Sequence, residues 1–258
     1  MKRFILPLEP DPEGRIRLCG EDYHYLVRVR RLKAGMSFDA VLPGGTETLV
    51  CVLSTTDNIL IGECLERGKK PPPLIPPIAL FQGIPKGDKM DLIIRQAAEG
   101  AVSIIAPFES EYSTVKLSGN CGEKIKRWKR IIKEARQQSG SPVETLVREP
   151  CGFDALLSYW ESLKKEYQRP LGILLHQAPL DKGTFHDYLD IVPDFVVLAV
   201  GPEGGFSPGE VSVFLAAGFK PLLMGDTVLR AETAALYGTA AVRTILLESE
   251  AWTLNLKK

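Results

Sequence analysis

A glycine-rich run between an apolar strand and a helix start is the part of this sequence best suited to bind a small molecule. The run Leu198–Glu210 reads LAVGPEGGFSPGE. It begins inside Phe195–Val200, a continuous apolar stretch that is typical of a buried strand in a parallel sheet. Ser207 and Glu210 have the spacing of a capping box, and Pro208 stands at the first helical position. The glycines let backbone approach a ligand in front of a helix start, where small molecules bind in open α/β folds.

A second strand-to-helix loop carries charged side chains. The stretch Lys220–Met224 is predicted to be a strand, and the residues after it read GDTVLRAETAA. Two such loops at the carboxyl ends of adjacent strands would form one crevice. Arg230 and Glu232 stand where the next helix begins. Each also has a plainer explanation, Arg230 as half of a surface ion pair and Glu232 as a partner of the helix dipole.

A third loop, Gln82–Lys89, places Lys86 and Lys89 beside the start of a helix that Asp88 is predicted to cap. Two cations gain nothing from the positive end of a helix. A polyanion nearby would explain them, and a solvated loop explains them nearly as well. None of the three loops has the Gly-x-Gly-x-x-Gly of a dinucleotide site or the Gly-Lys-Ser/Thr of a P-loop, so an ordinary tight turn also fits each.

The predicted helix over residues 123–138 has one apolar and one basic face. Ile125, Trp128, Ile131, Ile132 and Ala135 recur at helical spacing and should face the core. The rest of its surface has only two acids against seven basic residues, which are Lys124, Lys126, Arg127, Lys129, Arg130, Lys133 and Arg136. A charged helix face is usually only solvated. Here the excess of positive charge forms a stripe to which phosphate groups could bind.

Composition limits the classes of protein that fit. The chain has 258 residues, 45% of them hydrophobic and 25% charged, with a formal net charge of zero. Its apolar runs are too short to span a bilayer and its start lacks a signal-peptide pattern, so we expect a cytoplasmic protein that binds nucleic acid only through local patches. Five scattered cysteines without a C-x-x-C pair and three scattered histidines argue against zinc and against a disulfide framework.

The proline-rich segment 69–77 divides the chain into two patterns. Before it, short strands are predicted at 38–42, 48–53 and 59–61, with further strands at 3–6 and 15–18, which indicates a small antiparallel sheet or barrel. One helix is predicted over residues 22–33, with Leu26, Val29 and Leu32 facing inward. After the segment, strands at 78–82, 102–106, 171–176, 195–200 and 220–224 alternate with helices near 88–99, 123–138, 207–217 and 231–247. This alternation predicts a parallel sheet covered on both faces.

Three motifs in this order resemble the RsmE family, the methyltransferases that modify N3 of a uridine in 16S ribosomal RNA, within the SPOUT superfamily. They are QGIPKGDKM, GPEGGFSPGE and MGDTVLRAETAA, supported by the opening MKRF and by YHYL, VRRLKAG, RW, EA and QQS elsewhere. The resemblance covers nearly the whole chain. In place of arginines common in the family, this chain has Ser141, Thr227 and, near the third position, Tyr112.

The resemblance implies an architecture and a set of partners. Residues 1–70 would form a PUA-like RNA-binding β-barrel, and residues 71–258 a SPOUT-type α/β methyltransferase domain with a C-terminal trefoil knot. S-adenosylmethionine would be the cofactor, held in the knot by three loops, and no metal is expected. The protein would be a homodimer that acts on 16S ribosomal RNA (uridine 1498 in the family), either as free RNA or within the small ribosomal subunit.

The resemblance also implies roles for single residues. We expect the cofactor to be bound by Leu175, His176, Val200, Gly201, Pro202, Glu203, Gly204, Met224, Gly225, Asp226, Val228, Leu229, Arg230, Thr233 and Ala234. Arg230 would stabilise the uridine anion, and either Glu203 or Glu232 would serve as base or orienting group. Apart from the resemblance, the local excess of basic over acidic residues predicts phosphate contacts from Arg28, Arg30, Arg31, Lys126, Lys129 and Lys133, and such contacts are also expected from Arg3, Lys86 and Lys89.

Two other functions remain open at this point. The same loops would fit a methyltransferase with another acceptor, such as a ribose 2′-hydroxyl or a different base. The replaced arginines give weight to a non-catalytic RNA-binding ribosome-assembly factor, because Thr and Ser cannot reproduce a bidentate grip on phosphate. Binding of S-adenosylmethionine together with methyl transfer to RNA would separate these possibilities.

Overall fold

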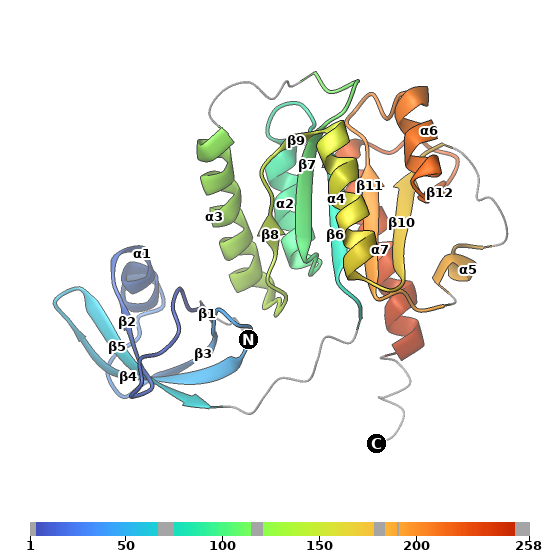
Figure 1. The fold of residues 1–258 in the computed structure, drawn as a ribbon. Helices are drawn as coiled ribbons and strands as arrows, with labels where there is room; N and C mark the ends of the chain where they lie inside the picture. Colours follow the sequence, from blue (N-terminus) through green and yellow to red (C-terminus); the bar gives the residue numbers. More distant parts are fainter. Residues whose placement is uncertain (1–3, 67–74, 115–120, 178–183, 190, 251–258) are drawn as a thin grey trace. The chain divides into compact units, whose positions relative to one another are not determined.

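The fold is known from a computed structural model, which describes residues 4–66, 75–114, 121–177, 184–189 and 191–250 (Figure 1). The chain divides into two compact units, one of residues 1–72 with 136–144 and one of residues 73–135 with 145–258. No helix in the described ranges is long and apolar enough to cross a membrane.

The larger unit is built on a parallel sheet of seven strands within the described residues (Figure 1). The strand order is β12-β10-β11-β6-β7-β8, and β9 also pairs with β7. The strands are β6 (Ile78–Gly83), β7 (Ile104–Glu109), β8 (Leu146–Val147), β9 (Cys151–Gly152), β10 (Pro170–Leu175), β11 (Phe195–Val200) and β12 (Lys220–Leu222). Central strands β6 and β11 are buried along their whole length, as continuous apolar runs in a parallel sheet require.

Helices cover both faces of this sheet, as the alternating pattern predicts. One apolar cluster joins α2 (Lys89–Glu99), α3 (Cys121–Ser139), α5 (Phe185–Leu189) and α7 (Ala231–Glu250) to the sheet. The other joins α4 (Phe153–Glu166) and α6 (Pro208–Ala216) to its opposite face. Alternate residues of β6 serve the two clusters, with Leu80 in the first and Phe81 in the second. In Figure 1, α4 lies in front of the sheet and α2 behind it.

Three predictions about this unit need correction, of which one is the strand expected at 220–224, because β12 ends at Leu222. Strand β7 begins at Ile104 instead of Val102, because the Val102 N–H bonds the Ala97 carbonyl in the turn that ends α2, where Ala101 has a φ of 57°. Helix α4 is missing from the predicted elements, although its buried residues Leu156, Trp160 and Leu163 recur at helical spacing.

The smaller unit contains a five-stranded sheet in the order β1-β3-β4-β5-β2. The strands are β1 (Phe4–Ile5), β2 (Arg15–Leu18), β3 (Ser37–Val41), β4 (Glu47–Thr56) and β5 (Ile59–Glu66). All pairs are antiparallel except β1 with β3. Within the described residues β1 and β2 are edge strands, so the sheet there is a half-barrel, and the closed PUA-like barrel stays a prediction.

The helix predicted over residues 22–33 is wrong in form. A short α1 (Gly20–Tyr23) runs into a π-helix, η1 (His24–Val29). The Arg30 N–H bonds the carbonyl of Tyr25, five residues back, so a turn holds more residues than in an α-helix. Leu26 is buried as predicted, but this wider turn carries Val29 outward, where it is 60% exposed.

Candidate cofactor-binding site

A cavity of about 240 Å³ lies at the carboxyl ends of three strands of the larger unit. About 15 Å³ suffices for one water molecule, so this space is suited to a small organic molecule. The end of β10 and the loop after it line the cavity with Leu175, His176 and Gln177. The end of β11 and the loop after it contribute Val200, Gly201, Pro202, Glu203, Gly204, Gly205 and Phe206, and the segment from β12 to α7 contributes Leu222, Leu223, Met224, Thr227, Val228, Leu229, Ala231 and Ala234.

The two predicted glycine-rich loops meet in one cavity, but their strands are not neighbours. Strand β10 pairs with both β11 and β12 and therefore separates them. The loops reach each other over the end of β10, where the His176 N–H also bonds the Leu222 carbonyl at 3.2 Å. The third predicted loop follows β6, on the other side of β11, and does not line the cavity.

Most residues predicted to bind the cofactor line this cavity. The exceptions are Gly225, Asp226, Arg230 and Thr233. Gly225 has a φ of 108°, so the turn itself requires glycine at this position. The lining residues that the prediction omits are Gln177, Gly205, Phe206, Leu222, Leu223, Thr227 and Ala231. Four of them lie inside the motifs already quoted, so the complete loop motifs predict the cavity lining better than the single residues chosen from them.

Gly201 is needed for packing between two parts of one loop. A Cβ at Gly201 would lie 2.9 Å from the carbonyl carbon of Gly205. At the end of β6, a Cβ at Gly83 would lie 2.5 Å from Cδ of Pro202. The loops after β6 and β11 therefore touch backbone to backbone, which only glycine permits.

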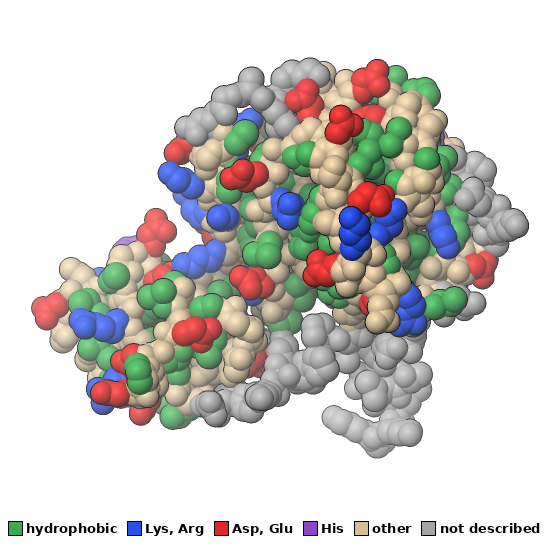
Figure 2. Space-filling view, in the orientation of Figure 1, with side chains coloured by type: hydrophobic (Ala, Val, Ile, Leu, Met, Phe, Trp, Pro, Cys, Tyr) green, Lys and Arg blue, Asp and Glu red, His purple; other side chains and the backbone are tan. Residues whose placement is uncertain are grey.

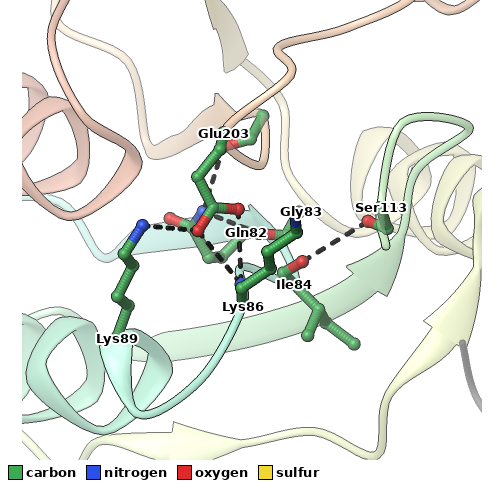
Figure 3. Close-up of polar contacts among 8 residues, drawn as sticks. Gln82, Gly83, Ile84, Lys86, Lys89, Ser113 and Glu203 are labelled. Atoms are coloured by element: carbon green, nitrogen blue, oxygen red, sulfur yellow. Dashed lines mark hydrogen bonds and ion pairs between the residues drawn. The ribbon is translucent and has the colours of Figure 1, made fainter. Parts of the chain in front are cut away.

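Glu203 fastens these two loops together with its carboxylate (Figure 3). Its Oε1 lies 2.6 Å from Nζ of Lys89 and accepts the Lys86 N–H at 3.1 Å. Partial burial raises the pKa of Glu203, but the hydrogen bonds from Lys89 and from backbone N–H groups, with the charge of Lys89, outweigh it and hold the pKa below its usual range. Glu203 is thus a bound anion at neutral pH and a weak proton acceptor.

Buried Gln82 adds a second link between the same loops (Figure 3). Its Nε2 donates to the carbonyl of Gly83 at 2.9 Å and to that of Gly201 at 3.3 Å. A polar side chain at the end of an apolar strand was the sequence signal for this contact. Asp88, at the N-cap of α2, makes no capping bond with its side chain, contrary to prediction, and instead lies 3.6 Å from Nη2 of Arg127.

The predicted capping box at α6 is present and also holds a third loop. Glu210 and Ser207 exchange the two expected bonds, at 2.9 and 3.2 Å. The buried Glu210 carboxylate additionally accepts the hydroxyl of Ser110 and the N–H of Glu111, both at 2.9 Å. The start of α6 therefore anchors the loop after β7 beside the cavity.

The two charged residues at the start of α7 differ in their surroundings. Arg230 is exposed and has no ion pair among the described residues. Glu232 is half-buried, and its Oε2 is inaccessible to solvent without a hydrogen-bond partner in the described part of the chain. An unpaired buried carboxylate oxygen is costly, and this one is left able to accept a hydrogen bond or a proton.

The residues predicted to contact RNA fall in both units. Arg28 and Arg31 are exposed, and the Arg30 guanidinium lies 6.0 Å from the centre of the Phe38 ring. Arg3 lies outside the described residues. Lys86 engages Glu203 only through its N–H, whereas Lys89 is bound to the same carboxylate by its ammonium group.

Basic side chains gather along α3 on the face shown in Figure 2. Lys126 and Lys129 are exposed, although Lys126 lies 3.4 Å from Glu123, and Lys133 is half-buried. Arg136 does not belong to this outer face, because it is only 7% exposed. Burial lowers the pKa of its guanidinium, and the charge of Glu144 opposes that effect.

A family model described as an RNA methyltransferase domain matches residues 71–243. The ribosomal RNA small subunit methyltransferase E of a Synechocystis strain is 31% identical over 95% of this chain and 78% of its own. The chain belongs to the ribosomal RNA small subunit methyltransferase E family. The resemblance carried by the three loop motifs is thereby confirmed.

Solved structures agree with this family assignment. The Neisseria gonorrhoeae methyltransferase E, bound to S-adenosylmethionine, is 25% identical with a TM-score of 0.78, over 95% of this chain and 98% of its own. A Legionella pneumophila methyltransferase in complex with the same cofactor is 27% identical with a TM-score of 0.80, over 96% and 97%. The mixed α/β fold with a parallel sheet is thus that of methyltransferase E structures.

Proposed function

We propose that this protein transfers a methyl group from S-adenosylmethionine to N3 of a uridine in 16S ribosomal RNA. The carrying observation is the cavity at the carboxyl ends of β10, β11 and β12, built by two of the loops whose sequences define the resemblance. Membership of the methyltransferase E family supports the cofactor and the ribosomal RNA. The choice of uridine and of its N3 atom rests on the resemblance.

The residues that line the cavity suit this cofactor. Leu175, Val200, Met224 and Leu229 offer apolar surface for a purine ring, while the glycine-rich loop leaves backbone N–H and C=O groups for polar atoms. When bound, S-adenosylmethionine supplies an electrophilic methyl group. The chain itself must hold the base in line with that group, take up the N3 proton and stabilise the resulting negative charge.

Three side chains divide these tasks in our proposal. The exposed guanidinium of Arg230, at the start of α7, stabilises the deprotonated base. Glu232 takes the proton, since one of its oxygens is unpaired, whereas Glu203 is already bound to Lys86 and Lys89. Glu203 is then a positioning residue that keeps the loops after β6 and β11 together.

We extend the proposal to the architecture that the resemblance implies. Residues 1–70 form a PUA-like RNA-binding barrel, and residues 71–258 form a SPOUT domain with a C-terminal trefoil knot. The protein is a homodimer that works in the cytoplasm on 16S ribosomal RNA of the small subunit. Support comes from the mainly antiparallel sheet in the first unit and the parallel sheet in the second.

The decisive experiment maps the modified nucleotide. Ribosomal RNA from a strain lacking this gene is compared with wild-type RNA by mass spectrometry of nuclease fragments. Purified protein is then given labelled S-adenosylmethionine with naked 16S RNA or with small subunits from that strain. We expect one N3-methyluridine to disappear and to be restored by the protein. If the restored modification is a 2′-O-methyl group or lies on another base, the proposed acceptor is wrong and that group is the acceptor. RNA binding without methyl transfer would indicate an assembly factor.

The roles given to Glu203 and Glu232 predict different kinetics for the two isosteric variants. Glu232→Gln should lower turnover about 100-fold, at the lower end of general-base effects, with unchanged affinity for S-adenosylmethionine.

Glu203→Gln should keep the pH dependence of turnover while it loosens the loops, lowering both thermal stability and cofactor affinity. Because the pKa of Glu203 is lowered in the folded protein, the wild-type contact is complete at neutral pH and is lost as the pH falls through that lowered pKa. An unchanged turnover of Glu232→Gln would remove it from the mechanism.

Basic residues of the first unit and of α3 should contribute phosphate contacts. Replacing Arg28, Arg31, Lys126 and Lys129 by Gln should weaken RNA binding and lower the slope of log affinity against log salt by about 0.9 for each lost contact. Cofactor affinity should not change. Lys165→Gln, an exposed lysine on α4, is the matched control. A slope equal to that of the wild type would show that these charges are only solvated.

A further inference from the structure

The loop after β7 is a rigid turn beside the cavity. Ser110 and Ser113 are buried, and two reciprocal bonds of 2.9 and 3.1 Å close the turn between them. The carboxylate of Glu210 fixes the turn from α6, and the Ser113 hydroxyl reaches the carbonyl of Ile84 at 3.5 Å (Figure 3). Tyr112 lies between the anchored residues Glu111 and Ser113, so its backbone is held in place by its neighbours and not by its own side chain.

Tyr112 lies against the loop that forms the cavity wall. A Cβ built on Gly204 would be 2.9 Å from Cβ of Tyr112 and 3.6 Å from its Cγ. Gly204 itself lines the cavity. The tyrosine thus occupies the space where any side chain at position 204 would stand, directly beside a residue that lines the cavity.

The ring of Tyr112 packs beside Gly204 but makes no polar or aromatic contact within the described residues. The residue is 45% exposed, and its ring makes no aromatic, cation–π or hydrogen-bond contact in that part of the chain. An exposed aromatic ring on a preorganised turn loses little conformational entropy when another flat group covers it.

We propose that Tyr112 is the platform on which an unstacked base of the RNA strand stacks at the mouth of the cavity. This inference rests on the proposed function. An enzyme that modifies a base must take it out of its stack, which costs free energy. Single-stranded bases regain part of that cost by stacking on aromatic side chains, irrespective of sequence.

The inference is tested by RNA affinity, measured by filter binding with naked 16S RNA and with small subunits from a strain lacking the gene. Tyr112→Ala should weaken binding to both about ten- to hundred-fold, the scale of one lost stacking contact. Tyr112→Phe should bind like the wild type, while Tyr112→Leu, with similar apolar bulk but no ring, should bind like the alanine variant. The salt dependence should stay unchanged, since no charge is removed.

Two further readouts separate stacking from damage to the fold. S-adenosylmethionine affinity by calorimetry should be equal in all variants, and Tyr112→Trp should show fluorescence quenching on RNA addition beyond that of the wild type. The inference is overturned if Tyr112→Leu binds RNA as well as Tyr112→Phe does. It is also overturned, in favour of a protein contact, if the variants lose affinity for small subunits but not for naked RNA. Equal RNA binding by all variants would overturn it while wild-type methyl transfer still upholds the proposed function. A wild type that binds no RNA would refute both.

Discussion

Arg230→Ala should lower turnover by about two to three orders of magnitude, the usual effect of removing one stabiliser of a developing anion. The reason is that negative charge appears on the uracil ring only as the N3 proton leaves, so the guanidinium acts mainly in the transition state. Cofactor affinity should change little, because Arg230 does not line the cavity. Single-turnover kinetics with saturating RNA measure the effect.

The conservative variant and a control make this prediction specific. Arg230→Lys should recover only part of the rate, since a point charge does not reproduce a planar fork. Arg169→Ala removes another exposed arginine, which directly precedes the amino end of β10, whereas the cavity lies at the carboxyl ends of the strands. This variant should leave turnover unchanged. Loss of S-adenosylmethionine binding and of thermal stability in Arg230→Ala would instead show that Arg230 braces its loop.

Gly201→Val should abolish binding of S-adenosylmethionine, with an affinity loss of at least about 100-fold in a calorimetric titration. The structure revises the reason, because the first atom to clash with a side chain is the carbonyl carbon of Gly205, at 2.9 Å. The loop must move away from itself, and the cavity wall moves with it. The parallel sheet should remain intact, since the clash lies beyond the end of β11, so circular dichroism should be close to that of the wild type.

A second glycine in the same segment provides the matched control. A Cβ at Gly209 would meet only Oγ of Ser207, at an ordinary 3.7 Å, so Gly209→Ala should bind the cofactor normally. Wild-type affinity in Gly201→Val would remove this loop from the site. Equal losses in both variants would show that any added side chain disturbs α6, and would leave no special role for Gly201.

The sequence by itself determined the parallel sheet and the main loops at its edge. Strand β11 and the start of α6 could be predicted because their signals are local, namely an apolar run, a capping box and a proline at the first helical position. Family membership was likewise readable from three short motifs in order. The helix at residues 22–33 was mispredicted because the hydrogen bonds of η1 span five residues, and apolar spacing alone does not distinguish a π-helix from an α-helix.

Only the tertiary structure decided which groups act together. The pairing of Glu203 with Lys89 joins residues 114 positions apart, and the contact of Glu210 with Ser110 joins residues 100 apart. Such contacts depend on strand order, which placed β10 between β11 and β12 and brought β6 beside β11. No local pattern encodes strand order, because it follows from how the helices pack on both faces of the sheet. For that reason the sequence identified the loops, whereas the fold separated a bound carboxylate, Glu203, from an unpaired one, Glu232.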